Sequence, residues 1–390
     1  MKYRYRMNMA GLVYLAITLL VGVAATVRPN NILVWVFGLL LSLILVSGII
    51  SGTSLFRMTM RRLDPGHGRV GRPLVVRYQV RGGSRLIPLF DLSVSEVPGS
   101  SARDWSRFSR PNPAWIMHVG PSETAHGESV LVPDRRGRMR LDRIVASSSF
   151  PFGLLGKVVE ISQPMETLVH PDTVPLSAAA LDRLFEGFGD GDRSGRRTGP
   201  VGEYAGLREY RFGDSIRSVA WKRWIPGEEP LVVQRASPSP RRLRLVLDLR
   251  RPTSELRLPE GEDRRAREER AIKLAASIAE SVILAGGEVG LLPVGPAAPE
   301  VRAHAGRRQL DRILTVLAGI DLDEDRASSP MVGNPGHGCV TVVVHVDRVD
   351  PDLGGEAAIH LLPSSLEGLA EDGPAVEPDV ARPGRGSRVA

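Results

Sequence analysis

The chain has 390 residues, of which 42% are hydrophobic, and it carries 51 Lys and Arg residues against 44 Asp and Glu, a formal net charge of +7. This length accommodates two soluble domains and a membrane segment, while the single cysteine, Cys339, excludes an internal disulfide framework and fits a reducing compartment. The basic residues are spread along the chain, without a zinc finger, an RNP-like aromatic motif or a basic helix. The positive charge therefore indicates an acidic membrane surface rather than nucleic acid.

Two uncharged apolar runs lie at the beginning of the chain, at residues 9–27 and 32–50. Each is long enough to cross a hydrocarbon core of roughly 30 Å as a helix. Residues 1–52 are therefore predicted to form a transmembrane hairpin in a lipid bilayer. A cleaved signal peptide is the alternative interpretation of the first run, but the second run follows it at once.

Basic residues flank both ends of this hairpin, whereas the turn between the runs holds only Arg28. By the positive-inside rule, both ends lie in the cytoplasm, and so does everything after residue 52. The sequence thus predicts a multi-pass protein of the inner (cytoplasmic) membrane whose soluble domains face the cytoplasm. The flanking residues are Lys2, Arg4 and Arg6 before the hairpin and Arg57, Arg61 and Arg62 after it.

Residues 60–171 have the pattern of short strands separated by turns at Gly and Pro. Alternating or β-branched stretches occur at residues 73–80, 90–94, 129–132, 139–141 and 157–161. Without a convincing helix between them, they predict a small antiparallel β-sandwich. Residues 172–201 are predicted to be a linker, in which a short helix ends near Phe185.

Residues 202–234 combine charged and aromatic side chains at a density found nowhere else in a chain that is 5% aromatic. The apolar spacing of Ile216, Val219, Ala220 and Trp224 predicts a short amphipathic helix that Asp214 caps. Two roles remain open for this segment. It could be a structural cluster in which arginines pair with carboxylates, or a docking face for a protein partner, because Tyr, Trp and Arg are enriched at binding hot spots. We call the following set the signature residues: Arg208, Glu209, Tyr210, Gly213, Asp214, Arg217, Trp221, Lys222 and Trp224.

After the signature residues the pattern changes to strands that alternate with helices. Strands are predicted at residues 243–249, 289–294, 340–346 and 357–362, and helices at 263–285 and 307–317. This alternation is typical of an α/β domain with a mainly parallel sheet covered on both faces. Residues 202–363 are assigned to this domain together with the signature, and residues 364–390 are predicted to be a disordered tail.

Several of these motifs resemble the bacterial family known as domain of unknown function 58. The resemblance rests on Leu207-Arg208-Glu209-Tyr210, Gly213-Asp214, Arg217 and Trp221-Lys222, and on Arg135-Arg136-Gly137 and Pro151-Phe152-Gly153-Leu154. The chain departs from the family at Phe150, where an Asp is expected, and after Lys222, where a small hydroxyl residue, Ala and Arg are expected. Trp224, next to that departure, is our candidate for a partner contact.

The resemblance implies a C-terminal domain similar to the von Willebrand factor type A domain. Such domains bind a divalent cation through Asp-x-Ser-x-Ser at the end of the first strand, because hard cations prefer oxygen ligands. Here Asp248 is present, but Arg250 and Pro252 occupy the two Ser positions. We therefore expect no metal site and no cofactor, and we expect Asp248 to pair with a nearby arginine.

The eight histidines are scattered, and neither a Gly-x-Ser-x-Gly elbow nor a Walker lysine occurs. His345 and His360 fall within predicted strands and are expected to be buried core histidines. The sequence thus favours a non-enzymatic protein, and the resemblance implies an adaptor that works with an AAA+ ATPase of the MoxR type in the assembly or maturation of complexes. The alternative is a hydrolase or transferase with an unrecognised active site.

Overall fold

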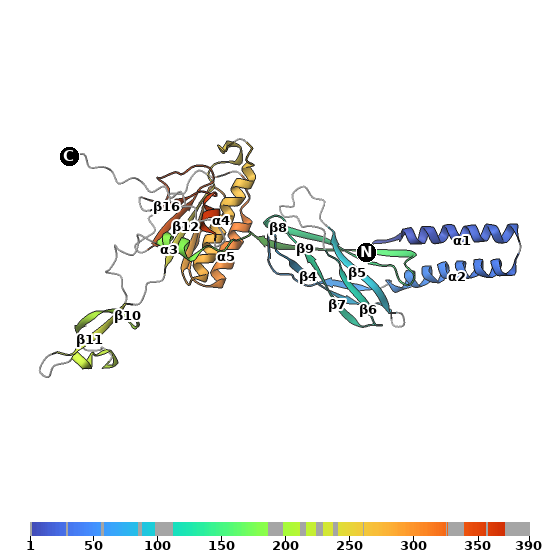
Figure 1. Cartoon of the computed structure of the whole chain (residues 1–390), viewed down its shortest axis with the longest axis horizontal. Coiled ribbons are helices and arrows are strands. Elements are labelled where there is room, and N and C mark those ends of the chain that lie inside the picture. The colour runs from blue at the N-terminus through green and yellow to red at the C-terminus, as the bar shows by residue number, and fades with distance from the viewer. Residues whose placement is uncertain are drawn as a thin grey trace. The chain divides into compact units, whose positions relative to one another are not determined.

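The computed structural model forms two compact units, Met1–Asp172 and Thr173–Ala390, each with its own sheets and its own hydrophobic core (Figure 1). It describes residues 2–28, 30–55, 58–84, 88–97, 112–185, 198–210, 216–223, 229–236, 241–259, 261–324, 326, 339–355 and 358–370.

The first unit contains the two apolar runs as helices α1 (Met9–Val27) and α2 (Asn31–Ser54). Within the described residues, both are long and apolar enough to cross a membrane, with mean hydropathies of 2.2 and 2.7. They lie side by side as a hairpin (Figure 1). A Cβ at Gly22 would lie 2.7 Å from the Phe37 ring, and the Tyr14 hydroxyl donates to the carbonyl of Leu40 at 3.3 Å. The absence of a side chain at Gly22 thus lets the two helices approach closely.

The rest of the first unit consists of sheets whose described strands pair antiparallel, as the sequence predicts, except that the short β3 runs parallel to β9. One sheet has the strand order β1-β9-β8-β5-β6, with β3 beside β9, and the other has the order β2-β4-β7. The strands are β1 (Lys2–Met7), β2 (Thr59–Arg62), β3 (Gly68–Arg69), β4 (Leu74–Arg81), β5 (Leu89–Val97), β6 (Ala114–Val119), β7 (Thr124–Leu131), β8 (Gly137–Ser148) and β9 (Leu155–His170). Alternate residues point to a shared core, as in β4, where Leu74, Val76, Tyr78 and Val80 are buried and their neighbours are not.

A buried ion pair lies inside this apolar core. The guanidinium of Arg62 contacts the carboxylate of Glu96 through two hydrogen bonds of 2.7 and 2.8 Å, and both side chains are at most 1% exposed. The Tyr78 hydroxyl also donates to Glu96 at 3.0 Å, and burial together with this carboxylate raises the pKa of Tyr78 far above its usual range. Arg62 donates further to the carbonyls of Leu141 and Gln163. Four strands, β2, β5, β8 and β9, are thereby joined through one guanidinium.

The N-terminal strand β1 was not anticipated from the sequence. It pairs antiparallel with β9, from Lys2 opposite Glu160 to Met7 opposite Leu155, and so forms an edge of the larger sheet. Its tyrosines cover a buried lysine, because the Lys157 ammonium lies 4.8 Å from the Tyr3 ring centre and 5.7 Å from that of Tyr5. Burial lowers the pKa of Lys157. The residues before α1 and the residues after α2 therefore belong to the same sandwich.

The second unit begins with a short helix and contains a two-stranded antiparallel sheet of β10 and β11 and a mixed sheet of order β14-β13-β12-β15-β16. Strands β13, β12, β15 and β16 run parallel, and β14 is antiparallel to β13. The elements are α3 (Ala178–Phe185), β10 (Thr198–Glu209), β11 (Leu231–Ala236), β12 (Arg242–Asp248), α4 (Arg264–Leu284), β13 (Glu288–Val294), β14 (Val301–His304), α5 (Arg307–Gly319), β15 (Cys339–Val344), β16 (Ile359–Leu361) and α6 (Ser365–Leu369).

The prediction that helices cover both faces of this sheet is wrong for the described part of the chain. Leu243, Leu245 and Leu247 of β12 pack in one cluster with α3, α4 and α5. On the opposite face, Val246 and Val343 pack with Leu353 and Ala358, which lie in the connection between β15 and β16. Strand β14 runs antiparallel to β13 and reverses the chain direction before α5. Helix α5 then packs beside α4 on the same face of the sheet, and not on the opposite face.

We predict that Glu96→Ala destabilises the first unit by about 3–5 kcal/mol, because it leaves the Arg62 guanidinium buried without its carboxylate. The matched control is Glu128→Ala. It removes the pair between Arg77 and Glu128, whose side chains are 64% and 59% exposed, and should cost less than about 1 kcal/mol. Urea unfolding of the detergent-solubilised protein measures both, and equal midpoints for the two variants would contradict this account of the core.

Candidate functional site

The carboxyl ends of β12, β15 and β16 bring together a group of charged and titratable side chains. The parallel register places Leu247 opposite Val344 and Val344 opposite Leu361, so Asp248 and His345 emerge at the same edge of the sheet. His345 Nδ1 lies 3.0 Å from a carboxylate oxygen of Asp248, and His345 Nε2 lies 2.9 Å from His360 Nδ1. We call these residues, with Arg250 and Asp350, the Asp248 network.

Arg250 occupies the position at which the metal-binding motif would have its first hydroxyl. Its guanidinium contacts both carboxylate oxygens of Asp248, at 2.9 and 3.1 Å, and one oxygen of Asp350 at 2.7 Å. The prediction that Asp248 pairs with a nearby arginine is confirmed. Of the two basic side chains around Asp248, Arg250 is the one with a permanent charge.

Titration behaviour follows from these contacts. Burial by itself would raise the pKa of the Asp248 carboxyl, but the hydrogen bonds from His345 and Arg250 outweigh it and hold this pKa well below the usual range. The hydrogen bond to Asp248 raises the pKa of Arg250 in turn. Burial, and then the neighbouring His345, lowers the pKa of His360. The network therefore contains an ionised Asp248–Arg250 pair near the buried imidazole of His360, which resists protonation.

His345 and His360 are 0% and 1% exposed, which agrees with the prediction that both are buried core histidines. Their rings stack with centres 5.2 Å apart. An Asp–His pair can orient a general base, but here the distal nitrogen of His345 faces a second imidazole rather than a hydroxyl or thiol nucleophile. The arrangement is suited to holding charge and strand ends in place.

A second buried ion pair, which sequence reasoning missed, lies beside this network. Arg326 and Glu268 are 2.6 Å apart, with side chains 2% and 0% exposed. The same guanidinium donates to the carbonyls of Leu249 and Arg251 and to the Thr253 hydroxyl. Arg326 thereby fixes the turn that follows β12. No spacing in the sequence marks it, because Glu268 and the residues of this turn lie 58 to 77 residues away.

Within the residues that the structure describes, no three His, Cys, Asp or Glu side chains are grouped so that they could hold a metal ion. A hard cation at Asp248 would have to displace a guanidinium that already contacts both carboxylate oxygens. The donor set around Asp248 therefore does not fit magnesium.

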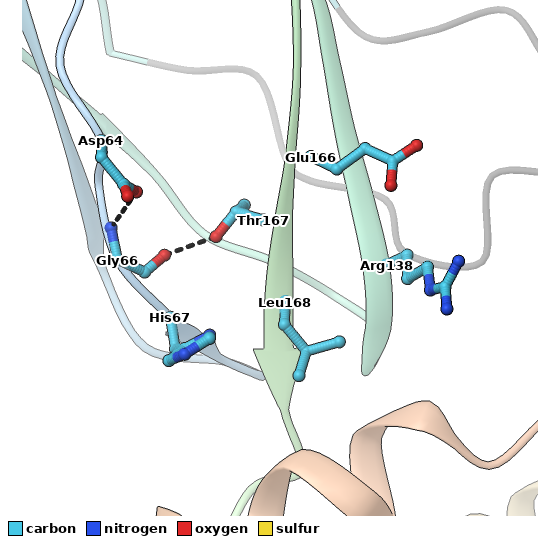
Figure 2. Close-up of a pocket in the computed structure, with 7 residues that line it drawn as sticks. All are labelled: Asp64, Gly66, His67, Arg138, Glu166, Thr167 and Leu168. Carbon is cyan, nitrogen blue, oxygen red and sulfur yellow. Dashed lines mark hydrogen bonds between the residues drawn. The ribbon is translucent and has the colours of Figure 1, made fainter.

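The first unit also carries a polar pocket of about 310 Å³, lined by Asp64, Gly66, His67, Arg138, Glu166, Thr167 and Leu168 (Figure 2). Gly66 donates through its N–H to Asp64 and accepts from the Thr167 hydroxyl, so both of these side chains are used within the turn. Glu166 and Arg138 lie on the other side of the β9 ribbon from Asp64 and His67 (Figure 2). The charged groups thus do not converge on a common point.

The signature residues lie on or beside the β10–β11 hairpin. Arg208 pairs with Val232 and Glu209 with Leu231, while Val219 forms a bridge to Val232. The predicted amphipathic helix is wrong, because two 3₁₀ turns, Ile216–Ser218 and Trp221–Arg223, take its place. The reason is that Ala220 N–H donates to the Leu231 carbonyl at 2.8 Å, so the backbone between the turns is bonded to β11.

Several signature residues are placed by these elements and others are not. Glu209, Arg217 and Lys222 are exposed, Tyr210 is half-buried, and Trp221 is 56% exposed. Gly213, Asp214 and Trp224 lie outside the described residues, as does the side chain of Arg208. The expected cap and ion pairs of Asp214 therefore stay predictions. Ile216 is 67% exposed and, like Trp221, lies on a short segment whose Val219 is buried.

Fold and site together define a protein with two N-terminal apolar helices, antiparallel sheets and a mixed α/β sheet whose leading aspartate is bound by arginine. Residues 206–344 match the family described as Protein of unknown function DUF58. The resemblance noted from the sequence is thereby confirmed. None of the curated proteins compared with the chain matches it.

Solved structures give a weaker likeness. One is the solution NMR structure of the CARDB domain of PF1109 from Pyrococcus furiosus, with 14% sequence identity and a TM-score of 0.19. The match covers 29% of this chain and 94% of that domain.

We predict that stability falls as the pH drops below the ordinary histidine pKa of 6.5. The unfolded state then binds a proton that the buried His360 does not, so stability that is complete above this pH is lost toward the lower pKa of the folded state. His360→Asn should remove this slope, which is at most about 1.4 kcal/mol per pH unit. Thermal unfolding at a series of pH values tests it, with the exposed His304→Asn as control. An unchanged slope in His360→Asn would refute it.

We also predict that millimolar Mg²⁺ leaves the melting temperature of the protein unchanged, because Arg250 neutralises Asp248 and Pro252 offers no side-chain oxygen. A ligand that binds only the folded state must raise the melting temperature in a saturable manner. Calorimetry with and without Mg²⁺ measures this, with Ca²⁺ as a second hard cation. Saturable stabilisation that disappears in Asp248→Asn would show that the site binds metal.

Proposed function

We propose that this protein is a non-enzymatic, membrane-anchored adaptor whose soluble units both lie on the cytoplasmic side of the inner membrane. The observation that carries the anchoring is the pairing of β1 with β9. Because β1 precedes α1 and β2 follows α2 in one sandwich, helices that cross a bilayer must cross as a pair and return to the same side. A single crossing, or cleavage after α1, would pull β1 out of its sheet.

The charge distribution supports the cytoplasmic orientation. Arg4 and Arg6 precede α1, and Arg61 and Arg62 follow α2, so both ends of the hairpin carry the positive charge that the positive-inside rule assigns to the cytoplasm. The lone Cys339 is buried, free and consistent with a reducing compartment.

The second unit is proposed to be a reduced von Willebrand factor type A-like domain that serves in protein interaction. The order of its parallel strands and the position of Asp248 at the end of β12 support this proposal. The guanidinium of Arg250 on Asp248 and the imidazole pair behind it favour a structural role for this edge over hydrolysis or group transfer.

The partner is proposed to be an AAA+ ATPase of the MoxR type, as the family resemblance implies, with the signature as the docking face. Support comes from the exposure of Ile216 and Trp221 beside Arg217 and Lys222. A large aromatic ring next to exposed cations has the composition of a binding hot spot. Together with the ATPase, the adaptor would act in the assembly or maturation of a complex.

We predict that Trp221→Ala weakens binding of the purified ATPase by at least about tenfold, since hot-spot truncations cost about 2 kcal/mol or more. The matched control is Trp115→Ala, which removes an equally exposed tryptophan, 63% against 56%, from β6 of the first unit. Trp224→Ala tests the contact expected from the sequence. Binding to the full-length protein in nanodiscs is measured by interferometry. Equal affinities of the Trp115 and Trp221 variants for the ATPase would refute the proposal that the signature is the docking face.

A reporter that is active only outside the cytoplasm, fused after Ala390, is expected to stay silent, whereas a cytoplasmic reporter at the same position should be active. The physical reason is the shared sandwich on both sides of the hairpin together with its flanking positive charge. Activity of the external reporter would overturn the orientation and, with it, a cytoplasmic ATPase as partner.

A further inference from the structure

We propose that the loop joining β8 to β9, residues 149–154, is a membrane-interface anchor that inserts the Phe152 ring between lipid headgroups and acyl chains. This inference rests on the proposed role of α1 and α2 as membrane spans. It goes further because it gives the sandwich a fixed point on the bilayer, separate from the helices themselves.

The length of α1 sets the depth of its first residue. Its 19 residues extend for about 28 Å at about 1.5 Å per residue, which is close to a hydrocarbon thickness of roughly 30 Å. A helix with no residues to spare must begin at one interface and end at the other. Met9, the first residue of α1, therefore lies at the interface on the side of the sandwich.

The β8–β9 loop contacts α1 at that depth, and Leu155, the first residue of β9, contacts α2. The Asn8 side-chain amide, directly before α1, donates to the Gly153 carbonyl at 3.0 Å. A Cβ at Gly11 would overlap the Leu154 carbonyl oxygen, so the loop backbone lies against α1 beyond its first residue. Gly48 of α2 faces the Leu155 side chain. Both helices are therefore held against this loop and the start of β9 where they leave the bilayer.

The loop has a defined shape. Gly153 adopts a left-handed conformation, φ +68°, that L side chains rarely take, and its N–H donates to the Ser149 carbonyl at 2.8 Å. Phe150, which stands where the family has Asp, stacks on Phe90 with ring centres 4.6 Å apart. Leu154 is 8% exposed, but Phe152 is 48% exposed. Phe152 thus stays about half exposed on a preformed turn whose neighbours Phe150 and Leu154 are packed.

The neighbouring strand supplies the complementary headgroup contacts. Arg6 of β1 pairs with Gly156, directly beyond the loop, and Arg4 and Tyr5 are exposed on the same strand. Aromatic rings and cations at the ends of spanning helices favour the headgroup region, and the anionic cytoplasmic leaflet attracts Lys and Arg. The loop and β1 therefore present one apolar ring and a short basic strand to the same interface.

The test places an environment-sensitive fluorophore on Phe152→Cys in full-length Cys339→Ser protein, reconstituted in phosphatidylcholine–phosphatidylglycerol vesicles. We expect blue-shifted emission that is quenched by phosphatidylcholine with a nitroxide near the top of its acyl chain and protected from aqueous iodide. The matched control is Val75→Cys, an apolar side chain that is 38% exposed. It lies near the far end of β9, about 45 Å away along the strand, and should show the reverse pattern.

A third probe at Leu19→Cys, in the middle of α1 and 70% exposed, tests whether the helices span the bilayer independently of whether Phe152 inserts into it. If the Leu19 probe is quenched by lipid nitroxide and the Phe152 probe only by iodide, the helices span the bilayer and the anchor is refuted. If neither probe is quenched by lipid, the spans themselves fail and the inference fails with them. Protection of Phe152 from iodide without any lipid quenching would mean that protein covers it, which also refutes a lipid anchor.

Discussion

The edge of the sheet in the second unit depends on neutralising the charge of Asp248. A carboxylate at the end of a central parallel strand sits largely out of water and must find a cation. In this chain the cation is the Arg250 guanidinium, only two residues further on, with His345 as a second donor. Because Arg250 supplies the positive charge from within the chain, the Asp248 carboxylate is part of a permanent ion pair and is not left open to a metal ion.

The same rule governs the interior of both units. Arg62 with Glu96 and Arg326 with Glu268 are ion pairs almost inaccessible to solvent, and each guanidinium also satisfies backbone carbonyls of distant segments. Replacing such a pair with apolar residues can be neutral, but removing one partner is costly. These pairs therefore act chiefly by fixing which distant segments meet. Substitution of one member of a pair alone is expected to destabilise the sandwich or the α/β sheet.

The N-terminal strand links this architecture to the two apolar helices. Because β1 belongs to the larger sheet of the sandwich and runs directly into α1, the position of the helices is tied to the position of β9. The hydrogen bond from Asn8 to Gly153 and the close approach of Gly11 to Leu154 act at the same place. If α1 and α2 span a bilayer as proposed, the sandwich would lie at a defined height above it, and the proposed partner contacts would fall to the signature residues.

Local patterns in the sequence determined the two apolar runs, the strands of the sandwich, the β/α alternation and the pairing of Asp248 with an arginine, because each depends on periodicity, run length or neighbours a few residues apart. Tertiary structure alone decided that β1 joins β9, that His345 meets His360, that Arg326 reaches Glu268 and that α5 lies beside α4. The helix expected after Ser215 illustrates the difference. Its apolar spacing was helical, but the bond from Ala220 to Leu231 belongs to a strand that follows later in the chain. Contacts between distant segments depend on sheet order and burial, which no local pattern records.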